Sequence, residues 1–166
     1  MLVTRVSKII FVAAIALYAT LVAFGNVTDY GSNFVFMQHV LSMDTIFPDA
    51  TIFYRAIDNP ALHHAAYMLV IAAEIATALV CWIGAGKMFA ARNAAALTFN
   101  RSKAWAVAGL TLGFLVWQVG FMTIGGEWFG MWMSSSWNSL QSAFRVFITI
   151  VGVLIFVVMP DADIER

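Results

Sequence analysis

The sequence contains a single cysteine, Cys81, among its 166 residues. One cysteine excludes an intramolecular disulfide, a Cys-x-x-Cys redox pair and a zinc site built on thiolates. The three histidines do not follow a metal-ligand spacing, so we predict no metal site. The chain also lacks a phosphate-binding Walker loop, a Gly-x-Ser-x-Gly nucleophile elbow and a Gly-x-Gly-x-x-Gly fingerprint. We therefore predict no catalytic residues and favour a protein that is not an enzyme.

Charged residues are scarce as well, at 11% of the chain, against about 25% in an ordinary soluble domain. The 9 basic and 9 acidic residues balance to a net charge of zero. Binding to a nucleic-acid duplex requires clustered Lys and Arg, so we predict no nucleic-acid partner. Hydrophobic residues make up 62%, more than a water-soluble chain of this length can bury. The composition predicts that the chain lies in a lipid bilayer.

Four apolar blocks are long enough to cross a bilayer, since a spanning helix needs about 20 residues. We predict spans at about 8–24, 61–84, 104–124 and 140–159. Residues that cap or break helices bound these spans: Gly25-Asn26, Asn59-Pro60, Gly125-Gly126, Asn138 or Ser139, and Pro160. The first block could also be a signal peptide, but its apolar stretch exceeds a typical signal core, so we expect a retained span.

The positions of Lys and Arg predict how the spans are oriented. The flanks before the first span, between the second and third, and after the fourth contain Arg5, Lys8, Lys87, Arg92, Arg101, Lys103 and Arg166. The two other connections contain only Arg55. Because Lys and Arg favour the cytoplasmic side, we predict cytoplasmic termini. The fold class is then all-α, a single domain (1–166) forming an up-down-up-down bundle of four transmembrane helices.

Small residues recur at four-residue spacing in two spans, as Gly109 with Gly113 and Ala72 with Ala76. Such pairs allow two helix backbones to approach closely in lipid. They could form a dimer face or pack inside the bundle, and we favour packing inside the bundle.

The two connections on the predicted outer side are unusually apolar. Segment 26–60 mixes apolar and polar residues, a pattern typical of a short helix in the membrane interface or folded over the bundle mouth. We expect it to form an ordered periplasmic cap. Connection 125–138 contains three of the six tryptophans. These could belong to an aromatic belt at headgroup level, which we favour, or provide a stacking surface for a quinone or sugar ring.

The candidate site residues of this outer face are polar or aromatic. They are Asp29, Tyr30, His39, Asp44, Arg55, His63, Glu127, Trp128, Trp132, Trp137 and Asn138. Haem ligation by His63 and His64 together is excluded, because adjacent helical residues point about 100° apart. Ligation by His39 with either of them stays open. We favour histidines that are polar interface residues and predict no cofactor, with quinone or haem as alternatives.

Polar side chains also occur within the predicted spans. Glu74 lies near the midplane, and Gln118 and Arg145 lie at similar depths closer to the outer surface. Charges at such depth usually face the bundle interior and pair with one another. We predict that Glu74 and Arg145 form an ion pair or share a network with Gln118, with Tyr67 lining the same space. The pair could fix helix register or serve as a proton-relay or anion site; both stay open.

Several short motifs are distinctive when taken together. They are Thr28-Asp29-Tyr30, His39-Val40-Leu41, Met43-Asp44-Thr45, Tyr54-Arg55-Ala56-Ile57, Glu74, Gly125-Gly126-Glu127-Trp128-Phe129, Met131-Trp132, Ser134, Trp137-Asn138 and Ala143-Phe144-Arg145. With these motifs the chain resembles a prokaryotic family of predicted small integral membrane proteins whose function is unknown. The resemblance covers nearly the whole chain. It implies four helices in a bacterial inner membrane, and it implies no activity.

Three functions remain as hypotheses. The first is a non-catalytic accessory or anchoring subunit of a larger membrane assembly, whose partner is another protein or a second copy of the chain. The second is a small transporter or solute-binding protein that uses Glu74, Gln118 and Arg145. The third is a quinone- or haem-linked redox subunit.

Overall fold

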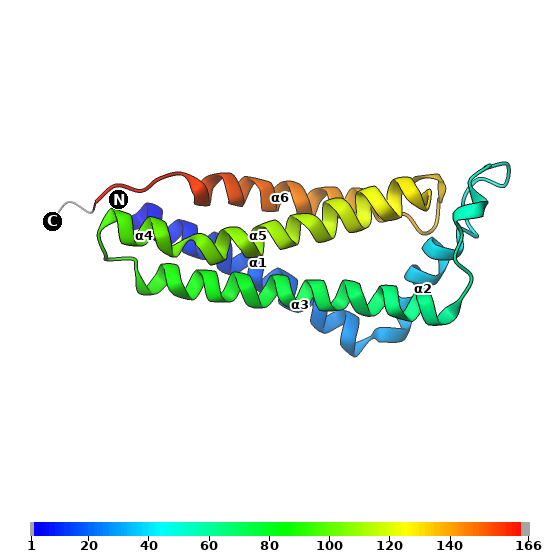
Figure 1. Ribbon diagram of the computed structural model, residues 1–166, viewed down its shortest axis with the longest axis horizontal. Coiled ribbons are helices and arrows are strands. Elements are labelled where there is room, and N and C mark those ends of the chain that lie inside the picture. Colours follow the sequence, from blue (N-terminus) through cyan, green and yellow to red (C-terminus); the bar gives the residue numbers. More distant parts are fainter. Residues whose placement is uncertain (1, 164–166) are drawn as a thin grey trace.

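The structure is a computed structural model that describes residues 2–163. Within that range it contains helices and connections but no strand, and Figure 1 shows the long helices side by side. The elements are α1 (Leu2–Thr28), α2 (Tyr30–Ser42), η1 (Phe53–Arg55), α3 (Pro60–Ala90), α4 (Ala96–Ser102), α5 (Ala104–Phe114), η2 (Leu115–Trp128), η3 (Met131–Met133) and α6 (Leu140–Val158).

Four helical stretches are long and apolar enough to cross a membrane. They are Leu2–Thr28, Pro60–Ala90, Ala96–Trp128 and Leu140–Val158. The predictions of an all-helical chain and of four candidate spans are therefore confirmed.

Two helix starts follow the predicted capping residues. The Asn59 Oδ1 accepts the Ala61 N–H at 2.9 Å, and Pro60 is the first residue of α3. The Asn138 Oδ1 accepts the Leu140 N–H at 3.1 Å. The predicted end of the first span at Gly25-Asn26 is wrong, because α1 continues to Thr28. A single glycine inside a helix costs only about 1 kcal/mol, so it does not by itself end a well-packed helix.

The third stretch contains a feature that the sequence did not indicate. Its second half, η2, is a π-helix, in which the N–H of residue i+5 donates to the carbonyl of residue i. The Phe129 N–H accordingly donates to the Ile124 carbonyl at 3.0 Å. The predicted end at Gly125-Gly126 is wrong. This glycine pair allows close packing instead, since a Cβ at Gly126 would lie 2.7 Å from a Leu140 methyl carbon.

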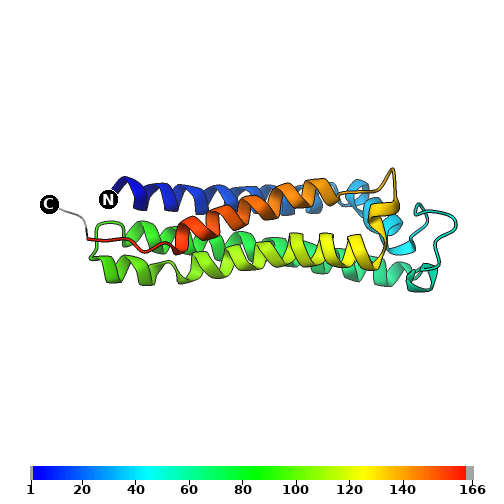
Figure 2. The same ribbon diagram turned by 90° about the horizontal axis from the view of Figure 1, so that it is seen from above.

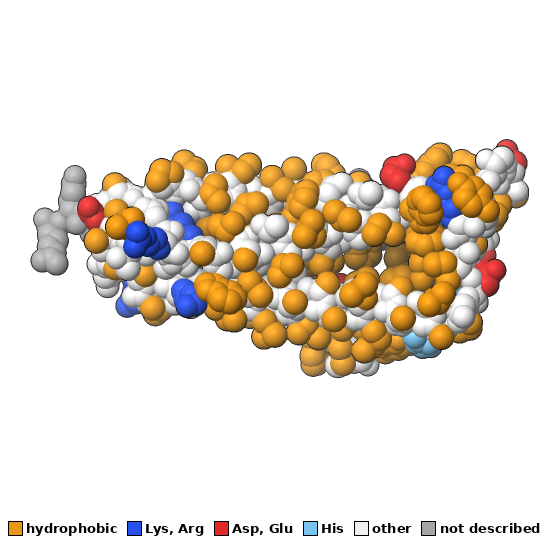
Figure 3. All heavy atoms as spheres, viewed as in Figure 1, with side chains coloured by type: hydrophobic (Ala, Val, Ile, Leu, Met, Phe, Trp, Pro, Cys, Tyr) orange, Lys and Arg blue, Asp and Glu red, His pale blue; other side chains and the backbone are white. Residues whose placement is uncertain are grey.

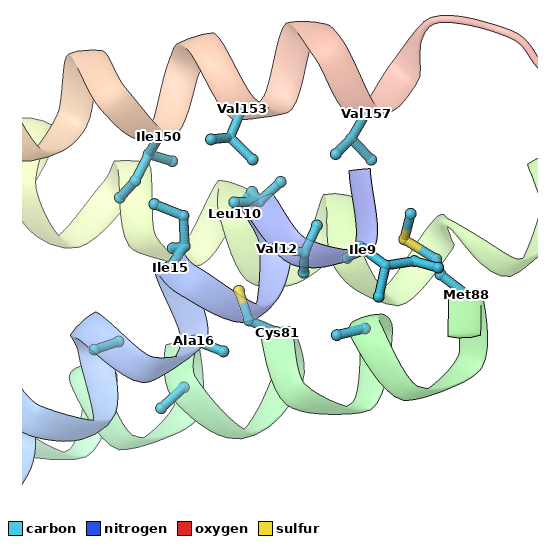
Figure 4. Close-up of a cluster of buried hydrophobic side chains, with 14 of the residues drawn as sticks. Ile9, Val12, Ile15, Ala16, Cys81, Met88, Leu110, Ile150, Val153 and Val157 are labelled. Atoms are coloured by element: carbon cyan, nitrogen blue, oxygen red, sulfur yellow. The ribbon is translucent and has the colours of Figure 1, made fainter. Parts of the chain in front are cut away.

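The core lies between α1, α3, α5 and α6. Figure 4 shows the side chains of Val12, Cys81, Leu110 and Ile150 converging from these four helices, and each is fully buried. Helices α3 and α5 cross where Gly109 faces Cys81, because a Cβ at Gly109 would lie 2.6 Å from the Cys81 Sγ. This small residue therefore serves packing within the bundle, as predicted.

The two ends of the molecule differ. One end, which we call the termini end, carries the N-terminus, the α3–α4 connection and the segment after α6 (Figures 1 and 2). The opposite end is a cap, which we define as residues 29–59 and 129–139. The cap has its own apolar cluster, including Met43 and Met131, which are at most 2% exposed. In Figure 3 hydrophobic side chains cover the length of the visible face, and Lys and Arg gather at the termini end.

Candidate functional site

A carboxyl group is buried inside the bundle, that of Glu74 on α3, a residue that is 1% exposed. The Asn26 Nδ2 donates to the Glu74 Oε2 at 2.8 Å. Asn26 reaches this position because α1 continues past Gly25. The Tyr67 hydroxyl donates to the Asn26 carbonyl at 3.3 Å. Glu74, Asn26 and Tyr67 thus form one polar group that joins α1 to α3.

The predicted Glu74–Arg145 ion pair is wrong. Arg145 is exposed on α6, and no ion pair of residues 2–163 includes Glu74 or Arg145. The reason is rotational. Arg145 follows the buried Ala143 by two residues, and two residues along an α-helix turn a side chain to roughly the opposite side. Similar depth in the membrane therefore did not imply contact.

Gln118, on η2, does not join the Glu74 group either. The Gln118 backbone carbonyl accepts a hydrogen bond from the Thr123 hydroxyl at 3.1 Å. Of the four residues predicted to form one network, the structure brings together Glu74 and Tyr67, through Asn26.

An aromatic cluster lies above this group, between α2 and α3. The His64 ring stacks on Phe34 at 4.0 Å between centroids, and the Tyr30 hydroxyl lies 2.7 Å from the His64 Nδ1. His63 points elsewhere, with its Nε2 at 2.5 Å from the Ile57 carbonyl. Asp29 is exposed and precedes α2. The cluster fixes α2 against the start of α3.

A second cluster joins α2 to the loop before α6. The His39 Nδ1 lies 2.8 Å from the Asp44 carboxylate, and the His39 ring stacks on Trp137 with 4.5 Å between centroids. Nearby, the Thr45 and Ser134 hydroxyls lie 2.8 Å apart, and the Ser134 Oγ accepts the Trp137 N–H at 2.9 Å. These contacts fix two loops that are far apart in the sequence.

A third cluster surrounds Arg55 of η1, which lies against the end of η2. Its Nη1 donates to the Trp128 carbonyl at 3.2 Å, and its guanidinium lies 4.7 Å from the Trp128 ring centre. A cation beside the last carbonyls of a helix is favourable. Glu127 is exposed beside it, and Trp132 packs edge-on against Phe47. The predicted outer residues therefore divide among three clusters and do not converge on one centre.

The histidines of these clusters have separate contacts. Within residues 2–163, no group of three or more His, Cys, Asp or Glu could hold a metal ion. His39, His63 and His64 each contact a different partner: Asp44, Ile57 and Tyr30 respectively. What the clusters share is an aromatic ring or histidine held by a hydrogen bond, an arrangement that stabilises loops.

The termini end contains a charged cluster that sequence reasoning missed. Lys8 on α1 and Lys103 before α5 both contact the Asp161 Oδ2, at 2.7 and 2.5 Å. The Asp161 side chain is only 3% exposed. Burial raises the pKa of the Asp161 carboxyl, but hydrogen bonds and positive charge from Lys103 and Lys8 outweigh burial and hold that pKa below its usual range. We call Lys8, Lys103 and Asp161 the termini clamp.

Arg5 supports this clamp with hydrogen bonds to backbone carbonyls alone. It is fully buried, and its guanidinium donates to Arg92, Ala94 and Ala162 carbonyls at 2.6–3.0 Å. One sequence signal could have indicated the clamp: Asp161 is an acidic residue directly after the fourth span, at the end where the basic flanks gather.

One comparison with known proteins gives a match. The model of the family described as "Predicted small integral membrane protein (DUF2165)" matches residues 4–160, which include all three outer clusters and the Glu74 group. No curated protein and no solved structure matches the chain.

Proposed function

This chain belongs to the family of predicted small integral membrane proteins, and from that premise we propose that it is a non-catalytic accessory subunit that binds a partner protein at its cap. In this proposal it crosses a bacterial inner membrane four times, up-down-up-down. The termini end lies in the cytoplasm and the cap on the periplasmic side. The gathering of Lys and Arg at the termini end supports this orientation.

The observation that carries the proposal is a set of exposed rings on a cap that is otherwise well fixed. Tyr54 is 76% exposed, and Phe47 and Trp132 are each about half exposed, as is Trp128 at the end of η2 next to the cap. The loops that bear them are held by the Arg55 and Ser134 hydrogen bonds. Rigid Tyr and Trp side chains lose little conformational entropy on contact, and they are enriched at the energetic centres of protein interfaces.

The other two functions have less support. The transporter hypothesis needed Glu74, Gln118 and Arg145 to converge, and Arg145 lies on the exposed side of α6. The redox hypothesis retains one contact, the stacking of His39 on Trp137. The other two histidines, His63 and His64, contact Ile57 and Tyr30 respectively, so the three histidines do not share one site.

Site-specific photocrosslinking in living cells tests the proposal. A benzophenone amino acid replaces Tyr54 or Trp132 on the cap and, as the matched control, Trp105 near the termini end, which is 46% exposed. We expect a discrete protein adduct from each cap position and none from Trp105. A partner identified in this way should no longer co-purify with the protein when Tyr54 and Trp132 are both changed to Ser. Lipid adducts alone at the cap positions would show that the rings belong to a membrane belt and would contradict the proposal.

A further inference from the structure

A cavity of about 340 Å³ lies between α2, α3 and η2 beneath the cap. Ligand-binding cavities in proteins begin at about 300 Å³. Every side chain that lines it is apolar, Leu41, Val70 and Phe121 among them. An empty apolar cavity of this kind excludes water and takes up hydrocarbon.

The π-helix shapes one wall of this cavity. Val116, Gly120, Phe121, Ile124 and Gly125 line it from η2, at spacings of four and five residues. Such residues share a face when hydrogen bonds join i to i+5. A Cβ at Gly120 would meet no atom within 4 Å. The missing side chain of Gly120 therefore contributes directly to the empty space.

The cavity opens sideways, towards the lipid. Leu69 and Ile124 on its rim are 71% and 48% exposed. Figure 3 shows openings in the visible face at the cap end, between η2 and α3. Because both helices belong to candidate spans, the opening faces acyl chains when the protein is in a bilayer.

Charged groups of both signs lie beside the opening. A depression of about 380 Å³ is lined by Arg55, Thr123, Glu127 and Trp128, and it shares Ile124 with the cavity. The Arg55 Nη1 is held by the Trp128 carbonyl, while its Nη2 makes no hydrogen bond within residues 2–163. The Glu127 carboxylate forms no ion pair within that same range.

We propose that this is a binding site for a zwitterionic phospholipid of the ethanolamine type, with one acyl chain in the cavity, its phosphate at Arg55 and its ammonium group at Glu127. Guanidinium and phosphate form charge-assisted hydrogen bonds, and the carboxylate is complementary to the ammonium group. Phosphatidylglycerol has no ammonium group to offer Glu127. A quinone carbonyl can accept a hydrogen bond from Arg55, but a quinone has no cationic group to pair with the Glu127 carboxylate.

Native mass spectrometry of the delipidated protein in detergent tests this site. The protein is titrated separately with phosphatidylethanolamine and with phosphatidylglycerol that has the same acyl chains. We expect the wild type to prefer the ethanolamine lipid. Gly120→Leu fills the cavity and should abolish the first high-affinity lipid. Gly152→Leu is the matched control, because a Cβ there also meets no atom within 4 Å and Gly152 lies outside the cavity lining.

Two charge variants separate the headgroup contacts. Arg55→Gln should weaken both lipids roughly ten-fold, the loss expected for one hydrogen bond to a charged group. Glu127→Gln should remove the preference for phosphatidylethanolamine and leave the binding of phosphatidylglycerol unchanged. Arg145→Gln is the control for loss of a cation elsewhere and should bind as the wild type does. Circular dichroism and the melting temperature of each variant establish that it is folded.

Three results would overturn the proposal. One is equal lipid binding by folded Gly120→Leu and Gly152→Leu proteins. Another is equal affinity of the wild type for the two headgroups. The third is a quinone that binds the wild type more tightly than either phospholipid and is displaced by Gly120→Leu.

Discussion

Among single residues, Asp161 is the one whose ionisation the fold depends on most directly. Its buried carboxylate is shared by Lys8 and Lys103, and its backbone is tied to Asn100 by two further hydrogen bonds. Removing one member of a buried ion pair usually costs about 3–5 kcal/mol, because the remaining charge stays buried without compensation. In the termini clamp two ammonium groups would be left facing each other.

We therefore predict that Asp161→Asn lowers the unfolding free energy by about 3 kcal/mol at neutral pH. The folded-state pKa of Asp161 is lowered. Its stabilisation is thus fully present above the unfolded pKa of about 3.9 and is lost as the pH falls through the lower folded value. Thermal unfolding in detergent between about pH 7 and about pH 3 should show the difference between wild type and variant shrinking towards the acid end. The exposed Asp49, changed to Asn, is the control. A difference in stability between wild type and Asp161→Asn that stays constant down to the lowest pH would contradict the prediction.

The sequence indicated which residues are unusual more reliably than which residues touch. Glu74 is buried and hydrogen-bonded, as a carboxyl within a span should be. Its partner is Asn26, which the sequence pattern predicts at the end of a helix. That error followed from treating Gly25 as a helix breaker. Depth along a helix can be counted from residue numbers, but the relative rotation of two helices depends on packing across the whole bundle.

At the scale of helices, close packing of α3 on α5 depends on glycines whose missing side chains make room. A Cβ at Gly84 would lie 2.5 Å from the Ala106 Cα, which is backbone and cannot move aside cheaply. Two residues further along the same helix, a Cβ at Gly86 would meet nothing within 4 Å. The two positions share a helix and a residue type and differ in what faces them.

We predict that Gly84→Ala destabilises the protein by about 1–3 kcal/mol through overpacking. Gly86→Ala should be neutral or stabilising by up to about 1 kcal/mol, since alanine favours a helix over glycine. Thermal unfolding of both variants in the same detergent measures the difference. Equal stabilities would mean that α3 and α5 do not approach as closely as Gly84 and Ala106 indicate.

The number and places of the spanning helices could be predicted because long apolar blocks carry that information directly. The π-helical form of η2 could not. Met131 of the cap and Leu140 of α6 pack against Gly125 and Gly126 respectively, whereas the same residues read alone resemble an α-helix that ends at a glycine pair. The same limit applies to the apolar cavity, since its η2 wall results from that π-helical geometry.

At the scale of the whole molecule, charge is divided unevenly between the two ends, and Lys and Arg beside spanning helices favour the cytoplasmic side. Of the cations at the termini end, Arg5, Lys8 and Lys103 are buried in the folded protein. Lys87 and Arg101 remain exposed to interact with headgroups, and Arg166 lies outside the described residues. The buried cations still contribute to orientation, because Lys and Arg near the ends of spanning segments act while those segments insert. The cap, by contrast, contains a single Lys or Arg residue, Arg55.

We therefore predict that the cap is outside the cytoplasm and the α3–α4 connection inside it. The chain suits a thiol-labelling test, since its own Cys81 is fully buried and should stay unlabelled in the folded wild type. Asp49→Cys places a thiol on the cap, and Asn93→Cys places one on the connection, both at exposed positions. A membrane-impermeant maleimide added to intact spheroplasts should label Asp49→Cys. Asn93→Cys should react only after the membrane is permeabilised. The reverse pattern would place the basic end outside, and it would mean that the charges at this end act within the fold, as in the termini clamp, and do not direct insertion.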